Sequence, residues 1–500
     1  MSRLHLDKKS TAIDYIIYEF MNLKKIIITS VFISISLQIS SCTSPKQIEK
    51  NNLISRTEIN VDQKMDTLKK TIQVPTFPDK KYIATKFGLN IHNSAIDNTI
   101  ILNKLIERCN HDGGGKIIIQ KGKYNIAKIH LLSNVNLHLE KGVELKFSTS
   151  PEDYLPVVKT SFEGNELMNY SPLIYAYQQE NIAITGEGVL NGQANNENWW
   201  PWVGAEQYGY INGQPKYTDP GNRDRLIEMS NNNTPVEKRI FGQDHYFRPA
   251  FIQTVESKKI LIDGIKIINA PFWIIHPFKS SHVTVNNVNI EIHGPNNDGC
   301  NPEYSSYIRI SNSTFNTGDD CIAIKSGRND EGRRVNIPSE NILIENCKMI
   351  DGHGGVVIGS EISAGVRNIF VRNCVMNSPN LERAIRIKTN SIRGGFVEDV
   401  YVKNLDVIEV EEAVLKINTF YGFYGEPEGP YIPSIRNIYL ENIRVKNGGK
   451  YAVMIDGRPQ KPVSNVVLKD FYVEKVKEAF KISDSEPIKF RNTQINGIKY

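Results

Sequence analysis

A six-residue phrase of alternating apolar and polar residues recurs along the chain. Its first copy is Asn181 to Gly186 (NIAITG), and its general form is x-Ile/Val-x-Ile/Val/Leu-x-Asn/Asp/Gly. Alternation with period two that ends at Asn, Asp or Gly predicts a short β-strand followed by a turn. The later copies begin at Lys259, His282, Tyr307, Asn341, Asn368, Asp399, Asn437 and Asn465.

The spacing of these phrases predicts the fold. From Lys259 onward, consecutive starts lie 23 to 38 residues apart, with no helical periodicity between them. Such repeats favour an all-β solenoid, the parallel β-helix, in which each strand pairs with its counterpart about 4.8 Å along the axis. A propeller or a β-sandwich is the alternative, but both need hairpin turns at shorter spacing. The residues that end five phrases are expected to stack as an amide ladder: Asn312, Asn346, Asn373, Asn404 and Asn442.

The ends and the interior of this solenoid are also predictable. Residues Thr99 to Cys109 have helical apolar spacing and precede three glycines, which indicates an N-terminal helix that caps the first coil. The residue after each ladder Asn points inward. Cys347 and Cys374 are therefore neighbours in the core, where we expect two reduced thiols rather than a disulfide.

The repeat is interrupted at about 190–250. This insertion contains Trp199, Trp200 and Trp202 and is rich in Tyr, Gly, Asn and Pro. We expect a loop that forms a wall or lid of a groove, with the Trp residues packed inside it. Stacking of the Trp rings on sugars is the alternative.

A targeting segment precedes the repeats. Met21 to Lys25 is basic, Ile26 to Ile39 is apolar and uncharged, and small residues lead to Cys42. This resembles a bacterial lipoprotein signal in which Cys42 is acylated, with translation starting at Met21. A transmembrane anchor is the alternative, but the run is shorter than the roughly 20 residues a spanning helix needs. We expect a leader over 1–41, a flexible tether over 42–80, a folded body over 81–500, and a place in the cell envelope, at the outer membrane.

The net charge and the cysteine spacing limit the kinds of ligand that the sequence suggests. The 500 residues carry a formal charge of +5, and removing the leader, with five basic and three acidic residues, leaves +3. This charge is too small to suggest a nucleic-acid partner. The six cysteines have no C-x-x-C spacing, so no zinc cluster is indicated. We expect a monomeric body made of one solenoid.

Charged residues gather where successive coils are aligned on a second face. Aligning the later strand of each coil puts Asp319 and His353 in one column. Arg386 and Lys388 alternate with inward isoleucines, so they point out into the same groove. One coil earlier, Asn296, Asn297 and Asp298 occupy a comparable place, and Asp320 and Lys325 follow Asp319.

This cluster predicts glycoside hydrolysis on an acidic sugar. Carboxyls held close together cannot all ionise easily, so one keeps a raised pKa and serves as general acid while the others activate water. Outward Arg and Lys beside them suit the carboxylate of a uronate. Each motif alone has an ordinary structural explanation, such as a solvated turn or a wet strand face. Their coincidence in one groove favours chemistry.

The four motifs resemble those of the polygalacturonase family, glycoside hydrolase family 28. They occur in the family's order, as Asn296-Asn297-Asp298, Gly318-Asp319-Asp320, Gly352-His353-Gly354 and Arg386-Ile387-Lys388. The resemblance extends more loosely from Ala84 to the C-terminus. It implies a right-handed parallel β-helix, inverting hydrolysis of α-1,4-galacturonosyl bonds in pectin, and no metal or other cofactor.

The resemblance also implies residue roles. Asp319 would protonate the glycosidic oxygen, and Asp298 and Asp320 would hold and deprotonate the attacking water. His353 would orient or tune the acid. The substrate-binding residues would be Asn296, Arg386, Lys388 and Tyr421, with Tyr421 on the leaving-group side.

The motifs leave other activities open. The alternatives are a xylogalacturonan or rhamnogalacturonan hydrolase, a pectate lyase on the same fold that requires calcium, and a noncatalytic pectin-binding β-helix. A groove walled by the 190–250 insertion favours exo action at a chain end over cutting inside the chain.

Overall fold

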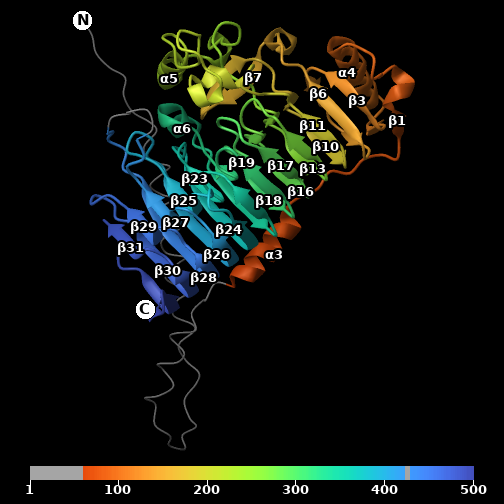
Figure 1. The fold of residues 1–500 in the computed structure, drawn as a ribbon. Helices are drawn as coiled ribbons and strands as arrows, with labels where there is room; N and C mark the ends of the chain where they lie inside the picture. Colours follow the sequence, from red (N-terminus) through yellow and green to blue (C-terminus); the bar gives the residue numbers. More distant parts are fainter. Residues whose placement is uncertain (1–59, 423–427) are drawn as a thin grey trace, which may run out of the picture. The chain divides into compact units, whose positions relative to one another are not determined.

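The predicted repeats are the strands of a parallel β-helix in the computed structural model, which describes residues 60–422 and 428–500 (Figure 1). The folded unit comprises Val61–Tyr500. All nine predicted phrases are strands of one long sheet, and each pairs in parallel with its counterpart in the next coil. The expectation of an all-β parallel β-helix is therefore confirmed.

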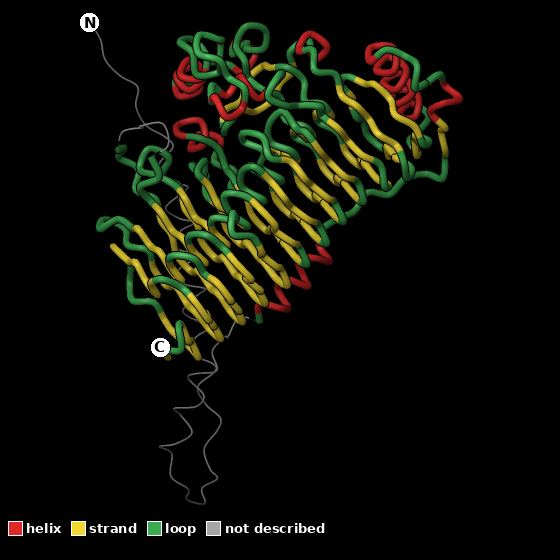
Figure 2. The backbone as a smooth tube through the Cα atoms, viewed as in Figure 1, coloured by secondary structure: helices red, strands yellow, loops and turns green. Residues whose placement is uncertain are grey.

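Strands of three sheets and one hairpin account for the β-structure of the described residues (Figure 2). The long sheet contains β1 (Lys81–Ile83), β2 (Gly115–Ile119), β3 (Gly122–Ile126), β5 (Val135–Leu139), β6 (Val143–Phe147), β10 (Glu180–Gly186), β11 (Val189–Asn191), β13 (Lys258–Asp263), β14 (Lys266–Ile268), β16 (Ser281–Asn286), β17 (Asn289–Ile292), β18 (Ser306–Ser311), β19 (Thr314–Thr317), β21 (Ser339–Glu345), β22 (Lys348–Asp351), β24 (Val366–Asn377), β26 (Phe396–Glu409), β28 (Ser434–Asn447), β30 (Ser464–Lys475), β32 (Lys489–Ile495) and β33 (Ile498–Lys499).

The second face of the solenoid is built from shorter strands. One sheet contains β4 (Ile129–His130), β9 (Ile174–Tyr177), β12 (Ile252–Val255) and β15 (Ile275–Phe278). The other contains β20 (Ile322–Ile324), β23 (Val356–Gly359), β25 (Arg383–Lys388), β27 (Ala413–Asn418), β29 (Tyr451–Asp456) and β31 (Glu478–Ser483). Single bridges through Cys300 join β15 to β20, so the two sheets form one continuous face.

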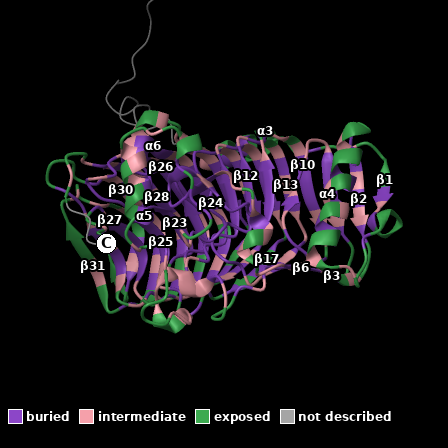
Figure 3. Cartoon of the chain, turned by 90° about the horizontal axis from the view of Figure 1, so that it is seen from above, coloured by how far each residue is buried: buried purple, intermediate pink, exposed green. Residues whose placement is uncertain are grey.

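Stacked apolar side chains fill the interior of the coils. Figure 3 shows that buried residues occupy much of the strands. In one column Ile260, Val283, Ile308 and Ile342 are paired in register, and each is at most 2% exposed. Each such side chain contributes roughly 1.5–3 kcal/mol by leaving water. Cys347 and Cys374 lie in this core as free thiols, as expected.

The predicted amide ladder is present at one corner. Asn346 donates to Asn312, Asn373 to Asn346, and Asn404 to Asn373, at side-chain distances of 3.2, 3.4 and 2.9 Å. Asn442 adds a further rung at 2.7 Å. These residues have φ of 52–56°, a left-handed conformation that Asn tolerates better than most residues. The Asn residues thus adopt the left-handed conformation that the turn requires, and their side-chain hydrogen bonds connect neighbouring coils.

The N-terminal cap is also as expected. α4 (Ala95–His111) starts after Ser94, whose side chain accepts a hydrogen bond from the backbone of Asp97 at 3.1 Å. Its buried face includes Leu102, Leu105 and Ile106, which join the core of the first coils. The helix therefore covers the open end of the stack.

Residues 61–80 correct the expectation of a flexible tether over 42–80. α3 (Val61–Thr71) lies on the outer surface of the long sheet, where Met65 and Leu68 pack with Phe370 and Tyr401. Three apolar residues among polar ones give too weak a periodic signal to predict this helix. Their burial depends instead on aromatic residues some 300 positions later in the chain. The predicted leader and Cys42 lie outside the described residues.

We call residues 61–80 the N-terminal strap. Asp66 of the strap lies 2.9 Å from Arg372, and the backbone of Gln73 donates to His282 at 3.2 Å. Thr76 exchanges two hydrogen bonds with Asn181 before the chain enters β1. The strap therefore runs back along the coils from the middle of the solenoid to its first strand.

Among the described residues, no helix combines the length and the hydrophobicity that a membrane span requires.

The insertion near 190–250 forms a wall rather than a separate unit. Its helical parts are η3 (Trp200–Val203), η4 (Glu206–Tyr208), α5 (Arg223–Asn231) and η5 (Val236–Lys238). Trp199 is 1% exposed, and the Trp200 indole donates to the Ala270 carbonyl at 2.9 Å. The Trp residues pack within the loop, as expected.

A hairpin that the sequence did not indicate completes this wall. It consists of β7 (Val158–Phe162) and β8 (Asn165–Asn169), which pair antiparallel and turn at Glu163 and Gly164. A short helix, α6 (Asn329–Val335), packs beside α5. The remaining short helices of the described residues are η1 (Ala84–Phe87) and η2 (Pro151–Tyr154).

Candidate active site

Five of the eight predicted site residues lie on three neighbouring coils of the second face. Asp319 and Asp320 precede β20, His353 precedes β23, and Arg386 and Lys388 lie on β25. The register pairs Ile324 with Ile358 and Ile358 with Ile387, so the outward residues beside them stack coil on coil. The predicted alignment of these three strands is therefore present in the structure.

Asp319 and His353 form an ion pair at the mouth of the site. His353 Nδ1 lies 3.1 Å from Asp319 Oδ1, and the imidazole side chain is half exposed. The hydrogen bond to Asp319 raises the pKa of His353, although burial opposes it. For Asp319, burial would raise the pKa, but His353 outweighs this effect and holds it below its usual range. The proton of this pair therefore resides on the imidazole of His353.

Asp298 lies deeper and behaves differently. It is 3% exposed and accepts a hydrogen bond from Asn301 at 2.7 Å. Lys325 Nζ lies 3.7 Å from Asp298 Oδ2. Burial, followed by the charge of Asp319, raises the pKa of Asp298 to about 8. Burial and the neighbouring charge therefore favour the protonated form of this carboxyl in the free site.

Asp320 is fixed by two of the three cations of β25. Lys388 Nζ donates to Asp320 Oδ2 at 2.8 Å, and Arg386 Nη1 lies 3.7 Å from Oδ1. Both cations also face Tyr421, with their charges 5.3 and 5.6 Å from its ring centroid. The predicted binding residues Arg386, Lys388 and Tyr421 therefore form one group with a predicted catalytic carboxylate.

Asn296 is positioned by a buried arginine. Its side-chain oxygen accepts from Arg248 Nη2 at 2.7 Å, while Arg248 Nη1 donates to the Pro295 carbonyl at 2.8 Å. Arg248 comes from the end of the insertion. All eight residues that the sequence predicted for catalysis and substrate binding line one pocket.

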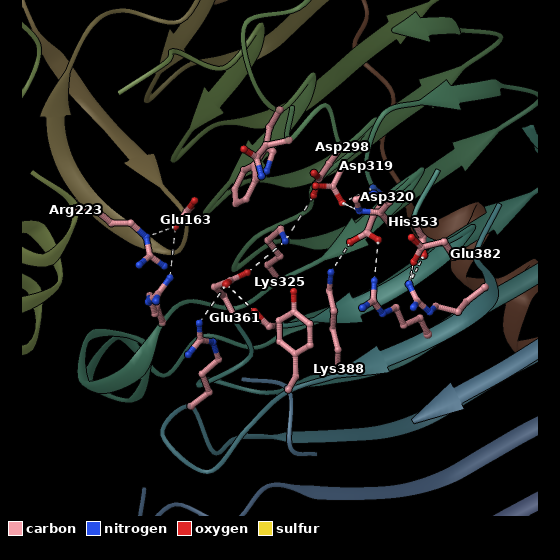
Figure 4. A pocket seen from close by; sticks show the side chains of 18 residues that line it. Glu163, Arg223, Asp298, Asp319, Asp320, Lys325, His353, Glu361, Glu382 and Lys388 are labelled. Carbon is pink, nitrogen blue, oxygen red and sulfur yellow. Dashed lines mark hydrogen bonds and ion pairs between the residues drawn. The ribbon is translucent and has the colours of Figure 1, made fainter. Parts of the chain in front are cut away.

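This pocket has a volume of about 250 Å³ (Figure 4). Seven Lys or Arg residues and six acidic residues, including Asp298, line it. The lining residues are Glu163, Arg223, Trp273, Asn296, Asp298, Asp319, Asp320, Lys325, Arg328, His353, Ser360, Glu361, Glu382, Arg383, Arg386, Lys388, Arg393 and Tyr421.

Lys325 divides the pocket into two halves. Figure 4 shows it between Asp298 on one side and Glu361 on the other, and its Nζ lies 3.3 Å from Glu361 Oε2. We call the side with Asp298, Asp319, Asp320, His353, Arg386 and Lys388 the strand half. The other side is the wall half, and it contains Glu163, Arg223, Arg328, Glu361 and Arg393.

Sequence reasoning missed the wall half. Glu361 and Arg393 follow β23 and β25 by two and five residues, so extending the aligned columns past the strand ends could have found them. Glu163 and Arg223 come from the β7–β8 turn and the start of α5, where no repeat indicates a position. The place of these two residues in the pocket follows only from the folded structure.

Comparison with known proteins places this site in a family. The profile of Glycosyl hydrolases family 28 matches residues 236–493. The crystal structure of an exopolygalacturonase from Thermotoga maritima is 40% identical, with a TM-score of 0.80 over 87% of this chain and 96% of that one. The chain therefore belongs to glycosyl hydrolases family 28.

Curated relatives agree with this assignment. A probable polygalacturonase from Vitis vinifera is 25% identical over 382 residues, which cover 74% of this chain and 69% of the relative. A polygalacturonase from Ralstonia solanacearum is 26% identical over 401 residues, covering 75% and 70%. The expected family and the expected class, a glycoside hydrolase, are confirmed.

Proposed function

We propose that this protein is an exo-acting polygalacturonase that hydrolyses α-1,4-galacturonosyl bonds of pectin at a chain end. The observation that carries the proposal is one walled pocket in which the Asp319–His353 pair, further carboxylates and seven Lys or Arg side chains converge. Cations around acid-base carboxyls suit a substrate made of uronates. The 40% identical exopolygalacturonase supports the same activity.

Asp319 is the proposed general acid. The proton on His353 Nδ1 passes to Asp319 as the glycosidic oxygen approaches, and Asp319 then protonates that oxygen while the bond to the anomeric carbon breaks. The leaving sugar departs as an alcohol. Because this step needs the proton held by the pair, kcat is expected to fall as pH rises through the raised pKa of His353.

Asp320 is the proposed base that takes the proton of the attacking water. Lys388 and Arg386 fix its carboxylate, while Asp298 keeps a proton at neutral pH and orients the water by a hydrogen bond. The water attacks the anomeric carbon on the face opposite to Asp319, which inverts its configuration. The family motifs imply that Asp298 and Asp320 together hold and deprotonate the water. In the proposed mechanism Asp298 orients the water and Asp320 takes its proton.

Products resolved by size test the activity. Polygalacturonate and oligogalacturonides with reduced ends are incubated with the protein, and we expect galacturonate monomer to appear first. A ladder of oligomers would contradict exo action. Unsaturated uronide absorbance that a chelator abolishes would indicate a lyase, and pectin binding without new reducing ends would indicate a noncatalytic protein. Faster release from xylogalacturonan or rhamnogalacturonan would reassign the substrate.

We also propose that the mature chain is a monomeric lipoprotein of the cell envelope, anchored at the outer membrane through Cys42. The support is the sequence pattern: a basic start at Met21, an apolar run and small residues before Cys42. In cells fed labelled palmitate, the label should enter the protein but not its Cys42→Ser variant. Equal labelling of both would overturn the anchor, and light scattering would test the monomer.

A further inference from the structure

Arg248 is a buried arginine that lies behind the pocket. It is 1% exposed, it comes from the end of the insertion shortly before β12, and it is not one of the described residues that line the pocket. A guanidinium carries five N–H donors in a fixed fork and needs acceptors when it is taken out of water. Acceptors for Arg248 are found in the turn that carries Asn296 and Asp298. A residue outside the pocket therefore contacts a segment that builds it.

The guanidinium of Arg248 connects the turns of two adjacent coils. Its Nη1 donates to the Pro271 carbonyl at 3.2 Å and to the Pro295 carbonyl at 2.8 Å. Pro271 comes three residues after β14 and Pro295 three residues after β17, and these two strands pair in parallel. The Nη2 atom donates to Asn296 Oδ1 at 2.7 Å. Arg248 thus fixes one turn relative to the next and holds the side chain of Asn296.

The wall holds Arg248 from the other side. The guanidinium carbon lies 5.2 Å from the centroid of the Phe272 ring, a cation–π contact. Phe272 stacks on Phe162 of the β7–β8 hairpin, with ring centroids 4.6 Å apart. The carbonyl of Phe247 accepts a hydrogen bond from Asn169 of the same hairpin at 3.2 Å. The hairpin and the insertion therefore fix the arginine before a substrate arrives.

The contact with Arg248 decides which end of the Asn296 amide faces the substrate. A guanidinium has donors only, so the Asn296 atom that lies 2.7 Å from Nη2 is the carbonyl oxygen. The polar group that remains for the pocket is the Nδ2 amino group, and Asn296 lines this pocket together with Asp298. Asn296 is therefore a hydrogen-bond donor there and suits an acceptor oxygen of a galacturonide.

We propose that Arg248 is a positioning residue, which holds the amino group of Asn296 toward the bound galacturonide without contacting the substrate itself. This inference rests on the proposed function. A lysine at this place keeps the charge, but a single ammonium cannot reproduce the planar fork that reaches two carbonyls and the amide. Holding a binding group in its bound orientation lowers the entropy cost of binding, so the contribution of Arg248 is expected mainly in KM.

A double-mutant cycle on trigalacturonate tests this role. In the wild-type background, Arg248→Lys should lower kcat/KM about 5- to 30-fold, as expected when one oriented hydrogen bond is lost. In the Asn296→Ala background the same change should lower kcat/KM less than about twofold, because the amide that Arg248 positions is absent. Arg436→Lys, which changes an exposed arginine paired with Glu398 on β28, is the matched control and should leave kcat/KM unchanged.

The Asn296→Asp variant tests the orientation of the amide. It keeps an oxygen for Arg248 but replaces the amino group by a second oxygen, which repels a uronate. We expect the melting temperature to stay near that of the wild type while KM for trigalacturonate rises at least about tenfold. This variant also decides the question if Arg248→Lys does not fold.

Two results would overturn the inference. One is an equal loss of kcat/KM for Arg248→Lys in both backgrounds, because additivity indicates that the arginine acts on the fold and not through Asn296. The other is an unchanged KM in Asn296→Asp. Both results leave the proposed function standing, whereas a wild-type protein that releases no galacturonate from trigalacturonate contradicts the proposed function itself.

Discussion

The two halves of the pocket are built in different ways. The strand half uses positions that the coil repeats: Asp319 and His353 are neighbours because their strands are in register, and Arg386 and Lys388 alternate with core isoleucines. The wall half uses segments that occur once, the β7–β8 hairpin, the start of α5 and the ends of strands. The repeated scaffold thus fixes the spacing of the residues in the strand half, whereas single insertions and loops position the residues of the wall half.

The two halves also differ in the pKa shifts of their buried carboxyls. In the strand half, burial and the crowding of carboxyls leave Asp298 with a pKa raised to about 8. In the wall half, burial would raise the pKa of Glu361, but Lys325, Arg393 and Arg328 outweigh it and hold the pKa below its usual range. One half therefore contains a carboxyl whose pKa is raised, and the other contains one, Glu361, whose pKa is lowered.

The largest expected effect separates chemistry from folding in the strand half. Asp319→Asn removes the proposed acid while keeping its size, so kcat on polygalacturonate should fall about 10²–10⁴-fold. The melting temperature should change little. Asp406→Asn, on the exposed side of β26, is the control and should keep full activity. An Asp319→Asn protein with nearly normal kcat would remove the basis for separating the two halves.

A smaller effect is expected when the wall alone is disturbed. Gly164 has φ of 86°, and a Cβ there meets Arg328 and Glu361, so Gly164→Ala must push the hairpin tip away. We expect kcat/KM on trigalacturonate to fall about 5- to 30-fold, corresponding to about 1–2 kcal/mol. Gly213→Ala is the matched control, since Gly213 also has positive φ but no atom within 4 Å of the added Cβ. Equal losses in both variants would attribute the effect to backbone strain alone.

The smallest expected effect is opposite pH dependence of stability in the two halves. Native Asp298 holds a proton that the unfolded chain releases, so its stabilising contribution is present at low pH and is lost as pH rises toward about 8. Glu361 has a lowered pKa, so its contribution is present above the unfolded pKa and is lost as pH falls through the folded value.

Calorimetry at pH 5 and pH 8.5 measures this difference. Asp298→Asn should gain about 2–4 °C relative to wild type on going from pH 5 to pH 8.5. Glu361→Gln should be less stable than wild type at both values. Parallel melting curves for Asp298→Asn and wild type across this range would contradict the raised pKa of Asp298.

Much of the fold was predictable because it repeats. The alternation after Lys259, Asn341 or Asn437 gives strands in register, and the ladder Asn residues mark the turns. Seven of the eight predicted site residues were accessible for the same reason, since column positions translate directly into neighbours in space, whereas Tyr421 was assigned from the family resemblance alone. The β7–β8 hairpin and Arg223 were not, because their place depends on a chain path through an insertion that no period describes. The docking of α3 escaped prediction because Phe370 and Tyr401, which bury its apolar side, lie far away in sequence.

The N-terminal strap has a consequence for how the chain folds. In most solenoids each coil contacts its immediate neighbours, so folding can advance coil by coil from wherever it begins. Here Asp62 pairs with Lys403, 341 positions later. During synthesis the strap leaves the ribosome early, yet its binding surface is complete only after most of the coils exist. Docking of the strap is therefore expected as a late, long-range event that closes the assembled stack, and it links the stability of the first coil to that of the middle ones.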